Sequence, residues 1–281
     1  MYLASKINCN NEYDQLKQVI VTRPTYMRID QVINETQKYY KDKNIDIDKA
    51  LAQHQNFAKV MIKLGVDVIE IEPRSFLNEQ VFTRDIGVTI GNQVLIAEMA
   101  TEQRQQETKY LKQLLAERGI PFKEINLGSI EGGDILVDRE TIWVGISERT
   151  SNEAVRALQQ LFPNYQVEPI HLTDGILHLD CTFNILNPNL ALVYPSGMDK
   201  QDYQKIKTHY QCIIVDEAEQ FTLGTNVLSV GGDKVISLPE NRKTNRKLIE
   251  ADLEVIELPF NEIIKSGGSF RCCTLPIYRG N

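Results

Sequence analysis

The feature that most constrains the fold is a repeated unit of two strands, a helix and a third strand. Residues 86–98 show how a unit opens, with two short apolar runs separated by Gly91-Asn92, a pattern that predicts a β-hairpin. A stretch with helical apolar spacing and another short apolar strand follow. Four copies can be traced, with turns about 45 to 50 residues apart, over residues 86–125, 134–170, 181–215 and 226–258.

A fixed period of this size is typical of radial or stacked architectures. The two ends of the sequence can supply a fifth unit, with strands at 19–22, 67–71 and 273–278 and a helix at 46–64. Pairing of the terminal strands would close a ring and protect edges that are otherwise exposed. We therefore predict an α/β fold, a pseudo-fivefold α/β propeller, formed by a single domain over 1–281. A generic α/β sandwich is the alternative.

Composition excludes several classes of function. Of the 281 residues 42% are hydrophobic and 25% are charged, as in ordinary globular proteins. The net charge of −7 and the pI near 5.3 leave no basic surface for nucleic acid. No apolar run approaches the roughly 18 residues that span a bilayer, and residues 1–15 lack the apolar core of a signal peptide. We expect a cytoplasmic protein without nucleic-acid or membrane partners, and a homodimer is left open.

The five cysteines do not form a recognisable framework. Their odd number, one adjacent pair and the lack of CxxC spacing argue against disulfides and a structural zinc site. Each cysteine is therefore free to be a buried apolar residue or a reactive thiol. They are Cys9, Cys181, Cys212, Cys272 and Cys273.

Reactive side chains recur at one point of the repeat, just before or at the first strand of a unit. A closed ring would bring these positions together at its centre, although they are far apart in the sequence. The set combines carboxylates, one imidazole and one thiol, and it predicts an active site. Its members are Asp85, Glu131, Asp134, His178, Asp180 and Cys272.

Each member has a plainer interpretation when taken alone. Cys272, at the start of the last strand, could be a small buried apolar residue. Cys273 would alternate to the opposite face, so the two thiols cannot share one role. His178 and Asp180 would lie on one face of a strand, where the carboxylate could orient the imidazole as an acid or base.

A metal site is the other interpretation of this pair. It needs a third ligand, which Glu131 or Cys272 could formally supply. Carboxylates outnumber good zinc ligands in the set. We therefore predict no metal, and activity that survives a chelator.

The combined set suits a planar cation with a poorly electrophilic carbon. A guanidinium presents N–H donors in a fork that matches carboxylates bidentately, so Asp85 and Asp180 could hold it with its carbon facing Cys272. The positive charge of this ligand would favour the thiolate. His178 could then protonate the leaving amine.

At these residues the sequence resembles the guanidino-group-modifying superfamily. Its members include arginine deiminase, dimethylarginine dimethylaminohydrolase (DDAH), agmatine deiminase and the amidinotransferases. The resemblance covers most of the chain and is closest to DDAH. It is carried by the ordered motifs VTRP, FTRD, EGGD, GISERT, HLD and GGSFRCCTLP. It implies a five-bladed α/β propeller that needs no cofactor.

The resemblance also implies roles for the reactive residues. Cys272 corresponds to the nucleophile, because Thr274 and Pro276 follow it at the family's spacing. His178 corresponds to the catalytic histidine and Glu131 to the carboxylate that supports it. The implied guanidinium ligands are Asp85 and Asp180.

Selection among guanidino substrates depends on the residues that would contact the α-carboxylate and α-amino group of the substrate. Arg149 corresponds to an arginine that binds the substrate α-carboxylate; alone, it could be a helix-entry arginine paired with Glu148. Glu79 replaces the aspartate or asparagine that relatives direct at the amino end. A second carboxylate-binding arginine is expected near 99–104, where Arg104 is the only candidate. Residues 23–40 are the expected lid.

The expected activity is cysteine-dependent hydrolysis of an N-ω-methylated L-arginine, giving L-citrulline and an amine through a covalent thiouronium intermediate. The chain is short, without room for the helical insertion of arginine deiminases. The alternatives are arginine deiminase, arginine dihydrolase and amidinotransferase on the same scaffold. A metal-dependent hydrolase and a guanidine-binding module without catalysis are rivals of other classes.

Overall fold

The computed structural model describes residues 6–280, which contain five three-stranded sheets. In each sheet an antiparallel pair is extended by a third strand that runs parallel to the central one. Four sheets use consecutive strands: β3 (Gly87–Ile90), β4 (Gln93–Ile96) and β5 (Phe122–Glu124); β6 (Ile135–Asp138), β7 (Thr141–Ile146) and β8 (Gln166–His171); β9 (Phe183–Asn187), β10 (Leu190–Val193) and β11 (Gln211–Ile214); β12 (Leu228–Gly231), β13 (Lys234–Ser237) and β14 (Glu254–Glu257).

The fifth sheet joins the two ends of the chain. β1 (Leu16–Thr22) is its central strand, between β15 (Leu275–Arg279) and β2 (Asp67–Ile71). β1 runs antiparallel to β15 and parallel to β2. The predicted pairing of the terminal strands is therefore confirmed.

Helices connect the second and third strand of every sheet. They are α2 (Ile47–Lys63), α3 (Glu107–Glu117), α4 (Asn152–Leu161), α5 (Lys200–His209) and α7 (Arg242–Glu250), with the shorter α1 (Glu35–Tyr40) and α6 (Glu217–Phe221) in connecting segments. α2 begins after Asp46, whose carboxylate accepts a hydrogen bond from Lys49 N and caps the helix. Its buried face carries Ala50, Phe57 and Met61 at helical spacing.

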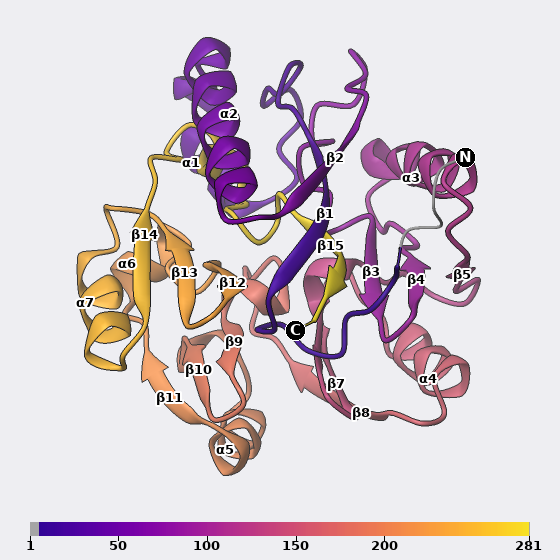
Figure 1. Ribbon diagram of the computed structural model, residues 1–281, viewed down its shortest axis with the longest axis vertical. Coiled ribbons are helices and arrows are strands. Elements are labelled where there is room, and N and C mark those ends of the chain that lie inside the picture. Colours follow the sequence, from indigo (N-terminus) through magenta and orange to yellow (C-terminus); the bar gives the residue numbers. More distant parts are fainter. Residues whose placement is uncertain (1–5, 281) are drawn as a thin grey trace.

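Five apolar clusters lie between neighbouring sheets rather than inside one common core. In one cluster, Leu111 of α3 packs with Ile69 of β2 and Val94 of β4. The other four repeat this arrangement around the molecule. In Figure 1 the sheets follow one another around a common centre, and the β1 sheet contacts the β3 and β12 sheets on its two sides.

Two local expectations were wrong. His178 and Asp180 do not share a strand, because Leu179–Cys181 form a 3-10 turn and β9 begins at Phe183. Leu179 N–H donates to Asp134 Oδ1 at 2.9 Å and holds this turn in place. The turn, not strand alternation, sets the directions of the two side chains.

Cys272 and Cys273 likewise precede the last strand, since β15 begins at Leu275. They lie in a turn that Thr274 Oγ1 stabilises by donating to Arg271 O at 2.9 Å. Strand alternation therefore does not separate the two thiols. Cys272 lines the pocket described below, and Cys273 is buried without lining it.

Candidate active site

The loops that lead into the first strands of different sheets converge on one buried pocket. Asp85 precedes β3, Glu131 precedes β6 and His178 precedes β9, while Cys272 precedes β15. The β12 sheet contributes Asn226, which the sequence analysis missed although it occupies the equivalent position. Its Oδ1 accepts a hydrogen bond from Cys272 N at 3.2 Å, and its Nδ2 donates to the Asp180 carbonyl at 3.3 Å.

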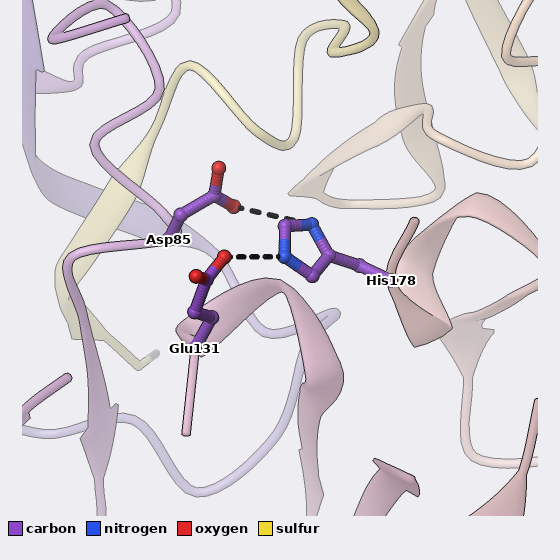
Figure 2. Close-up of side chains that lie close together, drawn as sticks. All are labelled: Asp85, Glu131 and His178. Atoms are coloured by element: carbon purple, nitrogen blue, oxygen red, sulfur yellow. Dashed lines mark hydrogen bonds and ion pairs between the residues drawn. The ribbon is translucent and has the colours of Figure 1, made fainter. Parts of the chain in front are cut away.

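The imidazole of His178 lies between two carboxylates (Figure 2). Nε2 is 2.8 Å from Glu131 Oε2, and Nδ1 is 3.6 Å from Asp85 Oδ1. Burial alone would lower the pKa of His178, but Asp85, Glu131 and Asp134 outweigh it and raise this pKa to about 9. The imidazole is therefore a proton donor at neutral pH.

Two polar atoms in the pocket are buried without a hydrogen-bond partner, Asp85 Oδ1 and His178 Nδ1. Buried polar atoms are normally paired. Both unpaired atoms lie near Cys272. Asp85 Oδ1 can accept a hydrogen bond from an N–H group of a ligand, and His178 Nδ1 can exchange a proton with a ligand nitrogen.

The thiol of Cys272 is buried beside Asp180. Its Sγ is 3.9 and 3.8 Å from the two carboxylate oxygens of that residue. Burial, together with the negative charges of Asp180 and Asp85, raises the pKa of Cys272 well above its usual value. The free site therefore holds a neutral thiol, and an added cation would favour the thiolate.

Asp180 has no strong hydrogen-bond donor in the free site. Its hydrogen-bond contacts come from the thiols of Cys272 and Cys181, and Arg271 Nε forms an ion pair with its Oδ2 at 3.3 Å without hydrogen-bond geometry. Burial raises its pKa, while the nearby Arg271 lowers it. Oδ1, which is contacted only by thiols, is thus open to a strong hydrogen-bond donor.

Arg104 does not supply the expected second carboxylate-binding arginine. Its Nη1 donates to Asp85 Oδ2 at 2.6 Å, and its Nη2 donates to Glu107 Oε2 at 2.9 Å. Because both nitrogens are engaged by buried carboxylates, Arg104 positions Asp85 and leaves only Oδ1 of that residue open.

Residues 23–40 cover the pocket. Arg149 Nη2 donates to the Ile33 carbonyl at 2.6 Å, and Asn34 Nδ2 donates to the Ser266 carbonyl at 3.0 Å. Gln37 Nε2 donates to Glu79 Oε1 at 2.9 Å. Arg149 and Glu79 thus line the pocket, and both contact the covering segment.

The covering segment leaves little free volume in the pocket. The pocket that contains Cys272 and His178 has only about 10 Å³ of free space, whereas a cavity of about 530 Å³ opens beside it and shares Ile33 and Glu79 as lining residues. Burial raises the pKa of Glu79 to about 7. A substrate therefore requires displacement of the covering segment, and Glu79 lies on its route.

Within residues 6–280, Asp85, Glu131 and His178 form the buried group that could hold a metal ion, with ligand atoms within 4.8 Å of one another. Guanidinium groups already approach this group. Arg104 pairs with Asp85, and Arg149 Nη1 is 3.5 Å from Glu131 Oε2. These contacts occupy carboxylate oxygens that a divalent ion would need as ligands.

A family model described as N,N dimethylarginine dimethylhydrolase, eukaryotic, matches residues 23–279. The chain belongs to this family. The match confirms the resemblance to guanidino-group-modifying enzymes. The chain is also 42% identical to YkgA, an uncharacterized protein of Bacillus subtilis, over 98% of this chain and 96% of that protein.

Two more distant relatives are named as enzymes that act on arginine. The chain is 26% identical to the bifunctional arginine dihydrolase/ornithine cyclodeaminase ArgZ of Synechocystis, over 92% of this chain and 37% of that protein. It is 27% identical to an arginine deiminase of Listeria monocytogenes, over 71% of this chain and 61% of that enzyme. A solved N-terminal domain of ArgZ, covalently bound to a reaction intermediate, has a TM-score of 0.86 at 26% identity and covers 93% of this chain and 98% of that domain.

Among residues 6–280 of this protein, no helix is both long enough and apolar enough to cross a membrane.

Proposed function

We propose that this protein hydrolyses a C–N bond at the guanidinium carbon of an N-ω-methylated L-arginine, with Cys272 as the nucleophile. The observation that carries the proposal is the pocket itself. It combines a buried thiol, a carboxylate-paired imidazole and Asp85, with Asp180 directly behind the thiol, and each of these two carboxylates has one open oxygen. Membership in the dimethylarginine dimethylhydrolase family supports the choice of substrate.

Binding of the substrate prepares the nucleophile. Asp85 Oδ1 and the Asp180 carboxylate accept hydrogen bonds from the guanidinium. The bound positive charge offsets the two carboxylates that raise the pKa of Cys272. The thiol therefore loses its proton to solvent when the substrate carbon is beside it, because His178 is already protonated. This limits reaction of the thiol in the free protein.

The chemistry then proceeds in two halves. The thiolate attacks the guanidinium carbon, and His178 donates its proton to the departing amine, leaving a covalent thiouronium group on Cys272. A water molecule next gives a proton to neutral His178 and attacks the same carbon. Citrulline leaves, and the thiol and protonated imidazole are restored.

The other end of the substrate selects an amino acid. Arg149 would bind the α-carboxylate and Glu79 the α-ammonium group. Because Arg149 and Glu79 contact Ile33 and Gln37 of the covering segment, we assign residues 23–40 as a lid that opens before binding.

The proposal extends to the whole chain. The five clusters between neighbouring sheets support one pseudo-fivefold α/β propeller over 1–281. We further propose a cytoplasmic enzyme that uses no metal or organic cofactor and acts alone or as a homodimer.

Arginine itself is the second candidate substrate. It is favoured by the similarity to arginine deiminase and to ArgZ, and the same residues could release ammonia instead of an amine. An amidinotransferase would pass the thiouronium carbon to an amine, and a binding module would form no covalent adduct.

Product analysis tests these proposals. The purified protein is incubated with arginine, monomethylarginine, dimethylarginine or agmatine. Citrulline with methylamine or dimethylamine supports the proposal. Citrulline with ammonia, ornithine, or a new guanidino compound would replace it with deiminase, dihydrolase or transferase activity. Failure to act on any guanidino compound, with Cys272 unreactive toward chloroacetamidine, would leave a binding module.

A further inference from the structure

Glu12 lies beneath the pocket and touches no part of it. It precedes β1 and is buried, with 4% of its surface exposed. Oε1 accepts hydrogen bonds from Arg84 Nη2 at 2.8 Å and from Val137 N at 3.0 Å, and Oε2 accepts one from Arg271 Nη1 at 2.6 Å. One carboxylate thus holds two buried arginines.

These two arginines are the chain neighbours of site residues. Arg84 directly precedes Asp85, and Arg271 directly precedes Cys272. Arg84 N also donates to the Cys272 carbonyl at 3.0 Å. Glu12 therefore joins the loop before β3 to the loop before β15.

Arg271 stands between two carboxylates. Its Nη1 donates to Glu12 and its Nη2 to the Ile135 carbonyl at 3.4 Å, while its Nε forms an ion pair with Asp180 Oδ2 at 3.3 Å but no hydrogen bond. A bidentate arginine–carboxylate pair is the favoured geometry when an arginine turns fully toward a carboxylate. In that geometry Arg271 would occupy the oxygens of Asp180 that a substrate guanidinium requires.

We propose that Glu12 is a positioning residue that holds Arg271 Nη1 away from Asp180, so that Arg271 approaches only Oδ2 through Nε and Oδ1 stays open to the substrate. This inference rests on the proposed function, in which Asp180 binds the guanidinium. An enzyme that binds guanidinium groups must leave at least one oxygen of each binding carboxylate free of its own arginines, and Glu12 does this for Asp180 by holding Arg271 Nη1. Arg84, which also bonds Glu12, donates its Nη2 to the Ile135 carbonyl and stays below the pocket.

Glu12→Gln tests the proposal, because the amide keeps the shape of Glu12 and the acceptor for Val137 N but loses the charge. Arg271 then turns to Asp180. Two constants are measured: KM for the best substrate, and KI for alkylation of Cys272 by chloroacetamidine, followed by mass spectrometry. Both should rise at least about tenfold, while kcat and the limiting alkylation rate stay within about threefold, since the reacting groups are unchanged.

A double variant distinguishes competition between Arg271 and the substrate for Asp180 from a purely structural role of Glu12. Glu12→Gln/Arg271→Met removes the competing guanidinium, and KM and KI should return to within about threefold of the unmodified protein. Asp202→Asn, at a buried carboxylate that pairs with His171 outside the site, is the matched control and should change neither constant.

Glu12→Gln deprives two buried arginines of their shared carboxylate, and loss of a buried ion-pair partner is strongly destabilising. If that variant does not fold, Arg271→Met alone decides the matter. With Glu12 still paired to Arg84, the proposal expects KI to be unchanged or lower. A tenfold rise in KI would show that Arg271 itself holds Asp180 and would overturn the proposal. So would normal constants in folded Glu12→Gln, or a double variant that binds no better than Glu12→Gln.

The proposed function is tested by the unmodified protein. If it neither hydrolyses a guanidino compound nor reacts with chloroacetamidine at Cys272, that function fails. If it does both and the variants do not separate as described, only the role of Glu12 fails.

Discussion

His178 Nε2 lies 2.8 Å from Glu131 Oε2 inside the pocket. Burial opposes the protonated imidazole, but the carboxylates of Asp85 and Glu131 raise the pKa of His178 to about 9. Activity that requires protonated His178 should therefore fall as pH rises through this pKa. In Glu131→Gln one stabilising charge is gone, and the alkaline limb of the kcat/KM profile should move down by at least about one pH unit. Glu153→Gln, on α4, is the control, and an unmoved limb would contradict the proposed acid.

Replacing Cys272 with serine should abolish turnover, because no other group in the pocket can form the thiouronium bond. We expect a loss of at least about 10³-fold in kcat, with an unchanged unfolding midpoint. Intact-protein mass spectrometry should detect no covalent adduct. Cys212→Ser, at a half-buried cysteine of β11, should retain full activity. Substantial turnover by the Cys272 variant would end the assignment of the nucleophile.

Stability should depend on pH through Glu79. Burial raises the pKa of Glu79 from 4.5 to about 7, so the folded protein binds more protons than the unfolded chain between these values. The contribution to stability is full below pH 4.5 and is lost as pH rises to 7, on the order of 3 kcal/mol. Glu79→Gln should remove this loss. Urea unfolding at pH 5 and 7.5 measures it, and parallel pH dependences for the two proteins would contradict the burial argument.

Arg149→Met should separate substrates with a carboxylate from those without one. Loss of a charge-assisted hydrogen bond is expected to raise KM for methylarginine or arginine by about 10- to 100-fold. KM for agmatine, which lacks the carboxylate, should stay nearly unchanged. Arg156→Met, at an exposed arginine of α4, controls for loss of charge. An equal rise for all substrates would instead indicate that Arg149 acts through Ile33 or Glu131.

Gly133 leaves room for the site side chains. A Cβ at this position would lie 2.7 Å from His178 Nδ1 and 2.9 Å from Asp85 Oδ1. Gly133→Ala should therefore displace the imidazole and lower kcat by at least about tenfold, with about 1–3 kcal/mol lost from the unfolding free energy. Gly280→Ala, whose Cβ comes no closer than 3.4 Å to Tyr278 Oη, should be neutral. Normal kcat in Gly133→Ala would show that the imidazole has freedom to move.

Periodic segments were predicted well because their signals are local. The strand expected at 67–71 is β2 (Asp67–Ile71), and the helix expected at 46–64 is α2 with Asp46 as its cap. The helical stretch expected after the hairpin at 86–98 is divided, since Glu102–Arg104 form a 3-10 turn before α3. There the buried pairing of Arg104 with Asp85 overrides local spacing.

The repeat indicated which side chains would come together, but not which contacts they would make with one another. The repeat placed Asp85, Glu131, His178 and Cys272 at equivalent points, and the structure brings them together. The roles of Arg104 and Asn226 could not be predicted, because each depends on contacts between loops of different sheets. A polar residue before β12 was the available signal for Asn226.

Pairing of β1 with β15 has a consequence for synthesis. β1 emerges from the ribosome long before β15, and its partner edge stays open during that interval. The loop with Cys272 is fixed only when β15 docks, so the nascent chain can present neither a completed pocket nor a directed thiol. Assembly of the reactive centre is thereby tied to the docking of β15, and a chain that stops before Cys272 should form no covalent adduct.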